Sequence, residues 1–168
     1  AIKEHETYED YLERLFQRIK KNIPILFKKI NYAKLTFSND NLIWTDIGLI
    51  PVNDSETVGD YNTPVCTLTT LAIQFKEENS NYLNIDPRLF LHSKMSEQSK
   101  AVLFLHEYIY LITRNAGKTS SRSTRLAISF LLRDETHDVA LMISATAIRQ
   151  YINLIFTARW KLNYSFPF

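Results

Sequence analysis

The sequence predicts a single α+β domain, with an N-terminal amphipathic helix, a small antiparallel sheet and a C-terminal helical half around a buried central helix. Apolar residues recur every three or four positions in the first thirty residues, and β-branched and aromatic residues dominate the next stretch. The second half carries apolar segments with helix-capping residues. A chain of 168 residues suits one domain, divided into residues 1–30, 31–92, 93–159 and an aromatic tail, 160–168.

The N-terminal segment, residues 1–30, is expected to be an amphipathic helix. Pro24 should kink or split it, because proline removes a backbone hydrogen bond and clashes with the preceding turn. The polar face is basic, and its lysines include Lys20, Lys21, Lys28 and Lys29. Five acidic residues precede this basic stripe, which favours a solvated face; a weak contact with an anionic surface is the alternative.

The next part is expected to be rich in β-structure. Residues 32–37 and 41–52 contain many β-branched and aromatic side chains, and Asn39 and Asp40 suit a turn between two strands. Residues 53–64 are polar and predict a long loop, which is functional or mobile in a domain of this size. Its acidic residues lack the spacing of a calcium loop, so a mobile surface loop is favoured.

A β-hairpin is expected after this loop. One strand should run from Cys66 to Lys76, with a bulge near Thr69 and Thr70, and a second from Tyr82 to Ile85. The polar residues between them predict the turn. Cys66 is the only cysteine, which rules out an internal disulfide and multi-cysteine metal sites, and a small buried hydrophobic role is favoured for it.

The remaining half is expected to be helical. Ser96 is a suitable N-cap and Gly117 a suitable C-terminal stop, which frames a buried central helix of about twenty residues. Ser120 or Ser121 should cap a second helix that runs to Leu132, and a third should follow over residues 139–158. Polar residues interrupt this last segment, so it predicts a core helix and not a transmembrane span.

Composition narrows the classes of function. A net charge of +2 is too small to indicate a nucleic-acid partner. The three glycines form neither a dinucleotide-binding fingerprint nor a phosphate loop. No cofactor is therefore expected from composition alone.

One motif carries potential chemistry, because His106 and Glu107 lie within an apolar segment and match the start of the zinc-peptidase helix H-E-x-x-H. Tyr110 replaces the second histidine, one helical turn after His106 on the same face. A zinc site would therefore need His106, Tyr110 and a ligand from the later residues Glu135 or His137, with Glu107 as the general base.

The alternative interpretation of the motif is structural. A buried Glu107 needs a partner, and arginine pairs with carboxylates through a planar fork, so Arg122, Arg125 or Arg114 should form an ion pair with it. His106 and Tyr110 would then be hydrogen-bonded core residues. A carboxylate pair of the glycosidase type, Glu107 with Asp86 or Glu135, is a further candidate.

Three segments stand out within about residues 64–133: the strand leading into N-I-D-P-R at 84–88, L-F-L-H-E-Y-I-Y at 103–110 and S-S-R-S-T-R at 120–125. Together they resemble a group of uncharacterised secreted bacterial proteins. These carry an H-E-x-x-Y helix followed by a Ser/Arg helix, similar to a degenerate zincin. The resemblance implies a periplasmic or extracellular location. We therefore expect a non-catalytic binding or structural module of an exported protein, with an unknown protein or cell-envelope partner. A zinc-dependent, metallopeptidase-like hydrolase is the alternative.

Overall fold

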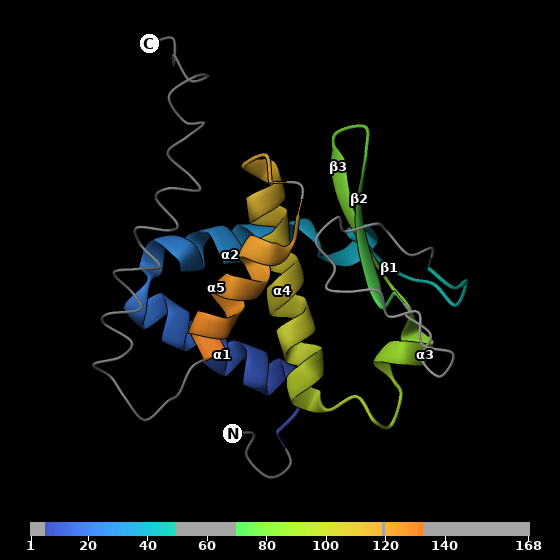
Figure 1. Ribbon diagram of the computed structural model, residues 1–168, viewed down its shortest axis with the longest axis horizontal. Coiled ribbons are helices and arrows are strands. Elements are labelled where there is room, and N and C mark those ends of the chain that lie inside the picture. Colours follow the sequence, from blue (N-terminus) through green and yellow to red (C-terminus); the bar gives the residue numbers. More distant parts are fainter. Residues whose placement is uncertain (1–5, 50–69, 119, 133–168) are drawn as a thin grey trace.

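The computed structural model describes residues 6–49, 70–118 and 120–132 (Figure 1). This part of the chain forms the elements α1 (Tyr8–Asn22), α2 (Pro24–Thr36), a 3-10 helix η1 (Asn39–Asn41), β1 (Leu42–Trp44), β2 (Ala72–Glu77), β3 (Ser80–Ile85), α3 (Pro87–Phe90), α4 (Glu97–Asn115) and α5 (Arg122–Leu132). The predicted α+β class is confirmed.

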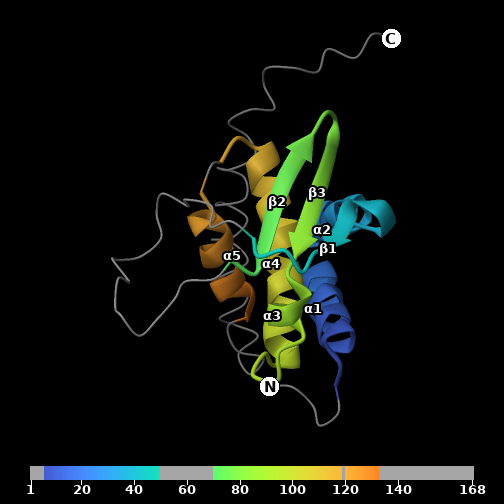
Figure 2. The ribbon, with the colours of Figure 1, turned by 90° about the vertical axis from the view of Figure 1, so that its right-hand side faces the viewer.

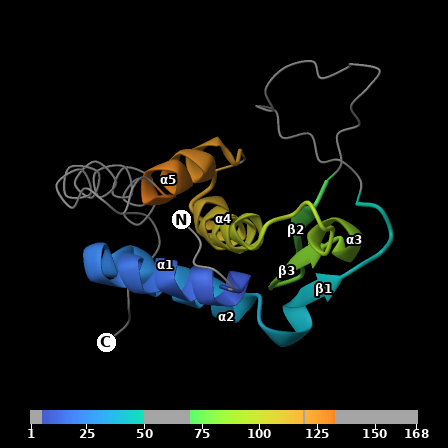
Figure 3. The same ribbon diagram turned by 90° about the horizontal axis from the view of Figure 1, so that it is seen from below.

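Helix α4 lies at the centre of the described part of the chain. Helices α1 and α2 lie on one side of α4 and α5 lies on the other, while the sheet packs along a third side (Figures 2 and 3). The core residues of α4 are therefore covered from several directions: Leu105 is fully buried and Leu111 is 1% exposed. No described helix has the length and apolar character needed to cross a bilayer.

The expected break at Pro24 is confirmed. Ile23 leaves helical geometry with φ −140° and ψ 68°, and Pro24 is the first residue of α2. Proline suits this position because its missing N–H has no partner in the first turn of a helix. The prediction of a strand over residues 32–37 is wrong, since α2 continues to Thr36. Ile30 and Ala33 are fully buried, so helix packing overrides the local β-propensity.

The sheet has the order β1-β3-β2. The predicted hairpin is confirmed as the antiparallel pair β2–β3, with Glu77 opposite Ser80 and a two-residue turn at Glu78 and Asn79. β1 pairs with β3 in parallel, so the small sheet is mixed where an antiparallel sheet was expected.

Of the strand expected over 41–52, the described residues 41–49 form β1, and Leu49 makes an isolated antiparallel bridge with Thr70. The loop 53–64, Cys66 and Thr69 lie outside the described residues.

Both predicted ends of α4 are confirmed. Ser96 Oγ accepts a hydrogen bond from the backbone N–H of Ser99 at 3.1 Å. At the other end Gly117 has φ 85°, and the N–H groups of Gly117 and Lys118 donate to the carbonyls of Arg114 and Thr113. This pair of bonds closes the helix with a left-handed residue, a conformation that glycine adopts without steric cost.

α5 packs against α4 through a buried polar contact. The hydroxyls of Thr113 and Thr124 lie 3.1 Å apart, and both residues are buried. Just before α5, the hydroxyl of Ser120 accepts a hydrogen bond from the backbone N–H of Arg122, the first residue of the helix, at 3.1 Å. The expected third helix, 139–158, and the tail, 160–168, lie outside the described residues.

Candidate functional site

The candidate site lies on α4 where the helix meets the hairpin. Glu107 is 5% exposed although it carries a carboxylate, whereas His106 is partly exposed. Burying a carboxylate in protein requires compensating hydrogen bonds. The burial expected for Glu107 is therefore confirmed, and its partners decide what the site can do.

Each oxygen of the Glu107 carboxylate has a protein partner. Nδ1 of His106 lies 2.9 Å from Oε1 of Glu107, and the side-chain amide of Gln74 donates to Oε2 at 2.8 Å. When Glu107 is ionised its oxygens only accept hydrogen bonds, and Nδ1 of His106 is then the donor. The same amide of Gln74 also donates to the backbone carbonyl of Glu107 at 2.6 Å. Gln74 thus joins β2 to α4 through two hydrogen bonds to one residue.

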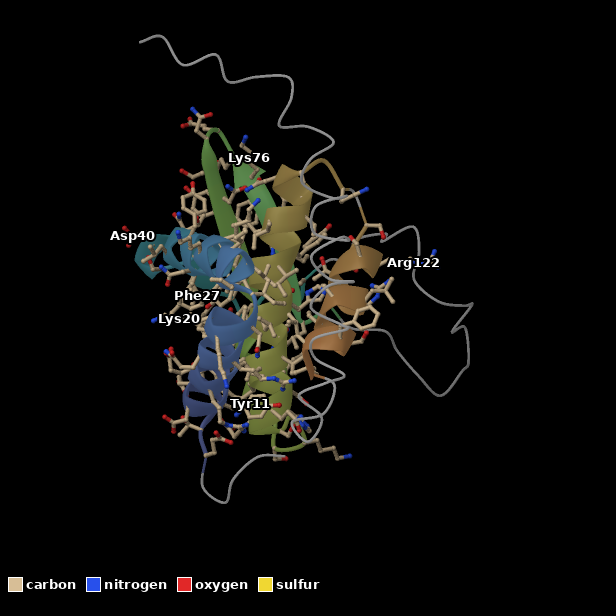
Figure 4. All side chains as sticks on the ribbon, turned by 90° about the vertical axis from the view of Figure 1, so that its left-hand side faces the viewer. Tyr11, Lys20, Phe27, Asp40, Lys76 and Arg122 are labelled. Atoms are coloured by element: carbon tan, nitrogen blue, oxygen red, sulfur yellow. The ribbon has the colours of Figure 1, made fainter. Side chains whose placement is uncertain are left out.

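The arginines predicted to pair with Glu107 lie elsewhere. Arg114 points Nη1 toward the side-chain carbonyl of Gln74 at 3.5 Å, which is long for a hydrogen bond. Arg125 of α5 donates to Ser121, the residue before the helix, and Arg122 is exposed on the first turn of α5 (Figure 4). The Glu107 carboxylate is instead compensated by the neutral amide of Gln74 on β2 and by His106, its neighbour on α4. These two side chains take the place of the arginine that was expected to form the ion pair.

His106 and Tyr110 lie side by side on α4. Their ring centroids are 5.9 Å apart with an interplanar angle of 29°. Because Glu107 occupies Nδ1 of His106, Nε2 is the ring nitrogen left for a ligand. In the described part of the chain no three His, Cys, Asp or Glu side chains converge to hold a metal ion. The remaining candidate ligands, Glu135 and His137, lie outside that part, so the described residues alone do not form a zinc site.

Comparisons of the chain with protein-family models, with curated proteins and with solved structures find no match. The site must therefore be interpreted from its own geometry.

Asp86, the carboxylate considered as a partner for Glu107, has a different role. It is 2% exposed, caps α3 by accepting from the backbone N–H of Arg88 at 2.9 Å, and binds the Arg88 guanidinium at 2.6 Å. The hydrogen bond from the Arg88 side chain holds the pKa of Asp86 below its usual range. Asp86 therefore stays ionised at neutral pH, which excludes it as the general acid of a glycosidase pair, and its carboxylate is bound to Arg88.

Gln74 is the site residue that sequence reasoning did not find. It lies in β2 between Ile73 and Phe75, opposite Leu83 of β3. Leu83 is fully buried, so its cross-strand partner belongs to the face that packs on the helices. In the sequence Gln74 alternates with the apolar Ile73 and Phe75, which assigns it to the opposite face, so only the pairing with Leu83 identifies it as facing the helices.

Proposed function

We propose that this domain is a non-catalytic, zincin-like binding or structural module of an exported protein, with a protein or another component of the cell envelope as its partner. The observation that carries the proposal is that both carboxylate oxygens of Glu107 accept hydrogen bonds from protein side chains. A general base must be reached by the water or substrate that it deprotonates, whereas Glu107 is only 5% exposed and both of its oxygens already have protein partners. Glu107 is instead used to hold α4 against β2.

The energetics of the contact agree with a structural role. Hydrogen bonds to a charged group contribute about 1.5–3 kcal/mol, and a buried charge left without a partner is strongly destabilising. Gln74 supplies one bond of this kind, to the carboxylate at 2.8 Å, and the same amide donates a second bond to the neutral backbone carbonyl of Glu107 at 2.6 Å. The position of the hairpin along α4 is therefore set by a polar contact with defined geometry as well as by apolar packing.

One observation favours the second candidate, a zinc-dependent hydrolase. A histidine whose Nδ1 is held by a carboxylate, as His106 is held by Glu107, is the arrangement that commonly orients a metal-binding imidazole. In that case Glu107 would position His106, and Tyr110 with Glu135 or His137 would be needed to complete the ligand set. This candidate depends on a metal ion that binds through Nε2 of His106.

Metal analysis separates the two candidates. The full chain, purified without added zinc, is expected to contain much less than one zinc per chain, and His106→Ala is expected to leave that content unchanged. His92→Ala is the matched control, since His92 is an exposed histidine on another segment. One zinc per chain that is lost in His106→Ala and kept in His92→Ala would overturn the proposal in favour of the hydrolase.

A double-mutant cycle tests the structural role directly. Gln74→Ala, Glu107→Ala and the double variant are compared by urea unfolding. We expect a coupling free energy of at least about 1 kcal/mol, since the two side chains are in contact. Glu77→Gln, a change of a nearby exposed carboxylate on β2, should leave stability within about 0.5 kcal/mol. Additive effects of Gln74→Ala and Glu107→Ala would contradict the structural role.

A further inference from the structure

We propose that the outward face of α2 docks on the surface of an anionic lipid bilayer. The inference concerns a different surface from the Gln74–Glu107 contact and does not depend on it. It rests on three observations. Apolar side chains are exposed on one face of α2, lysines lie around them, and residues 14–39 contain no acidic side chain.

The apolar side chains of this face are unusually exposed. Ile25, Tyr32 and Leu35 are 67%, 68% and 63% exposed, whereas Leu26, Ile30 and Ala33 of the same helix are buried. At about 100° per residue, the three exposed residues and Lys28 fall within about 80° of arc, opposite the buried side. We call these four residues, Ile25, Lys28, Tyr32 and Leu35, the α2 face.

The charged residues of α2 and of the second half of α1 are all basic. Residues 14–39 contain seven Lys and Arg residues and no Asp or Glu. Lys20, Lys21, Lys28 and Lys34 are exposed. Two of them lie over aromatic rings, Lys20 at 5.7 Å from the ring centre of Phe27 and Lys34 at 5.3 Å from that of Phe16, which keeps these cations on the α1–α2 layer. Figure 4 shows Lys20 of α1 beside Phe27 of α2.

Apolar and basic side chains on one helix face match the interface of an anionic bilayer. Aliphatic side chains gain free energy on entering the acyl boundary, tyrosine is favoured at headgroup depth, and lysines attract anionic headgroups. A nucleic acid would engage the lysines but would give Ile25 and Leu35 no apolar environment. A second copy of the chain docked through the same helices would bring two basic surfaces together, because residues 14–39 contain no acidic side chain. The lipid surface is therefore the occupant that uses both properties.

Vesicle partitioning of the full chain tests the proposal. With equimolar phosphatidylcholine and phosphatidylglycerol we expect binding that weakens as salt rises, and much weaker binding to phosphatidylcholine alone. Lys28→Gln should lower the partition coefficient about five-fold. The double variant Ile25→Ser/Leu35→Ser should lower it more than about ten-fold, because two aliphatic side chains lose their burial.

Matched controls distinguish this face from the general surface. Leu91→Ser removes an aliphatic side chain that is 70% exposed at the end of α3, and Lys76→Gln removes a cation from the hairpin, away from α2 (Figure 4). Neither change should alter partitioning more than about two-fold, and circular dichroism should show every variant folded. Because the substituted side chains are exposed, a loss of binding will report on the surface and not on the core.

Three results would overturn the proposal: equal binding to anionic and uncharged vesicles, unchanged binding of Ile25→Ser/Leu35→Ser, or a dimer in sedimentation that this variant dissociates. Glu107→Ala and Gln74→Ala should keep vesicle binding if they remain folded. The lipid proposal and the proposed function can therefore fail separately.

Discussion

Thr124 donates its hydroxyl proton to Thr113 in the interface between α4 and α5. The direction follows from the other bond of Thr113, whose hydroxyl already donates to the carbonyl of Tyr110 at 3.0 Å. A hydroxyl has one proton, so the 3.1 Å contact between the two threonines must use the proton of Thr124. The two residues are not equivalent, and substitutions should reveal the difference.

We expect Thr113→Val to destabilise the fold more than Thr124→Val. Thr113→Val leaves the hydroxyl of the fully buried Thr124 without its acceptor, at a cost of about 1–3 kcal/mol. Thr124→Val leaves Thr113 bonded to the Tyr110 carbonyl and should cost about 0.5–1.5 kcal/mol. Urea unfolding of both variants measures the difference; equal losses, or the reverse order, would contradict the assigned direction.

The Asp86–Arg88 pair should contribute stability that depends on acidic pH. The hydrogen bond from Arg88 lowers the pKa of Asp86 in the folded state below the unfolded value of about 3.9. Its contribution is therefore present above about pH 4 and is lost as pH falls through the folded pKa. Arg88→Met removes the cause of the shift, so the difference in unfolding free energy between wild type and Arg88→Met should shrink below pH 4. Arg122→Met, at an exposed arginine on α5, should show no such pH dependence.

Tyr108 should limit stability at alkaline pH. Burial raises the pKa of this α4 phenol to about 12, whereas an unfolded tyrosine has a pKa of about 10. The unfolded state then loses a proton that the folded state keeps, so stability falls as pH rises above 10. Tyr108→Phe should flatten the decline between pH 10 and 12, measured by urea unfolding. Tyr32→Phe, at an exposed tyrosine, is the control and should leave the slope unchanged.

Alanine substitutions at two glycines should distinguish a position that needs a left-handed backbone from one that only has room for a side chain. Gly117 has φ 85°, a conformation that costs other residues roughly 1–2 kcal/mol, so Gly117→Ala should lower stability by about 1 kcal/mol. At Gly48 an added Cβ would meet Nη2 of Arg88 at 3.7 Å, an ordinary contact. Gly48→Ala should leave stability unchanged or raise it by up to about 1 kcal/mol. Thermal unfolding compares the two; a harmless Gly117→Ala would show that the α4 end tolerates another geometry.

Helix boundaries were predicted correctly where a single capping or helix-breaking residue determines them. Pro24 breaks the first helical segment, and Ser96 and Gly117 bound α4, because each acts on the backbone within one turn. The strand assigned to 32–37 failed for the opposite reason. Its aromatic and β-branched side chains favour a strand locally, but Leu26, Ile30 and Ala33 have helical spacing and are buried together. Tertiary packing decided the conformation there.

The candidate site was predicted only in part. Apolar neighbours were sufficient to predict that Glu107 is buried, because burial depends on the helix that carries it. Its partner Gln74 is 33 residues away, and that contact depends on how the hairpin lies along α4. An arginine would be the stronger partner by residue type, yet Arg122 and Arg125 lie on α5 away from Glu107, and Arg114 of α4 points toward the side-chain carbonyl of Gln74. Residue type suggests which side chains could pair, but the arrangement of the helices and strands decides which of them are in contact.

The parallel pairing of β1 with β3 has a consequence for the order of folding. Leu42 is opposite Leu83, so the pair closes a loop of about forty residues, whereas the β2–β3 turn and the α1–α2 break are local. Long closures are entropically delayed relative to such neighbours. We expect β1 to join last, so the fluorescence of Trp44, which contacts Phe90 at a ring distance of 5.1 Å, should recover after the helical signal during refolding of a Trp160→Phe chain. The three-residue strand β1 would then be the last of the described strands to pair.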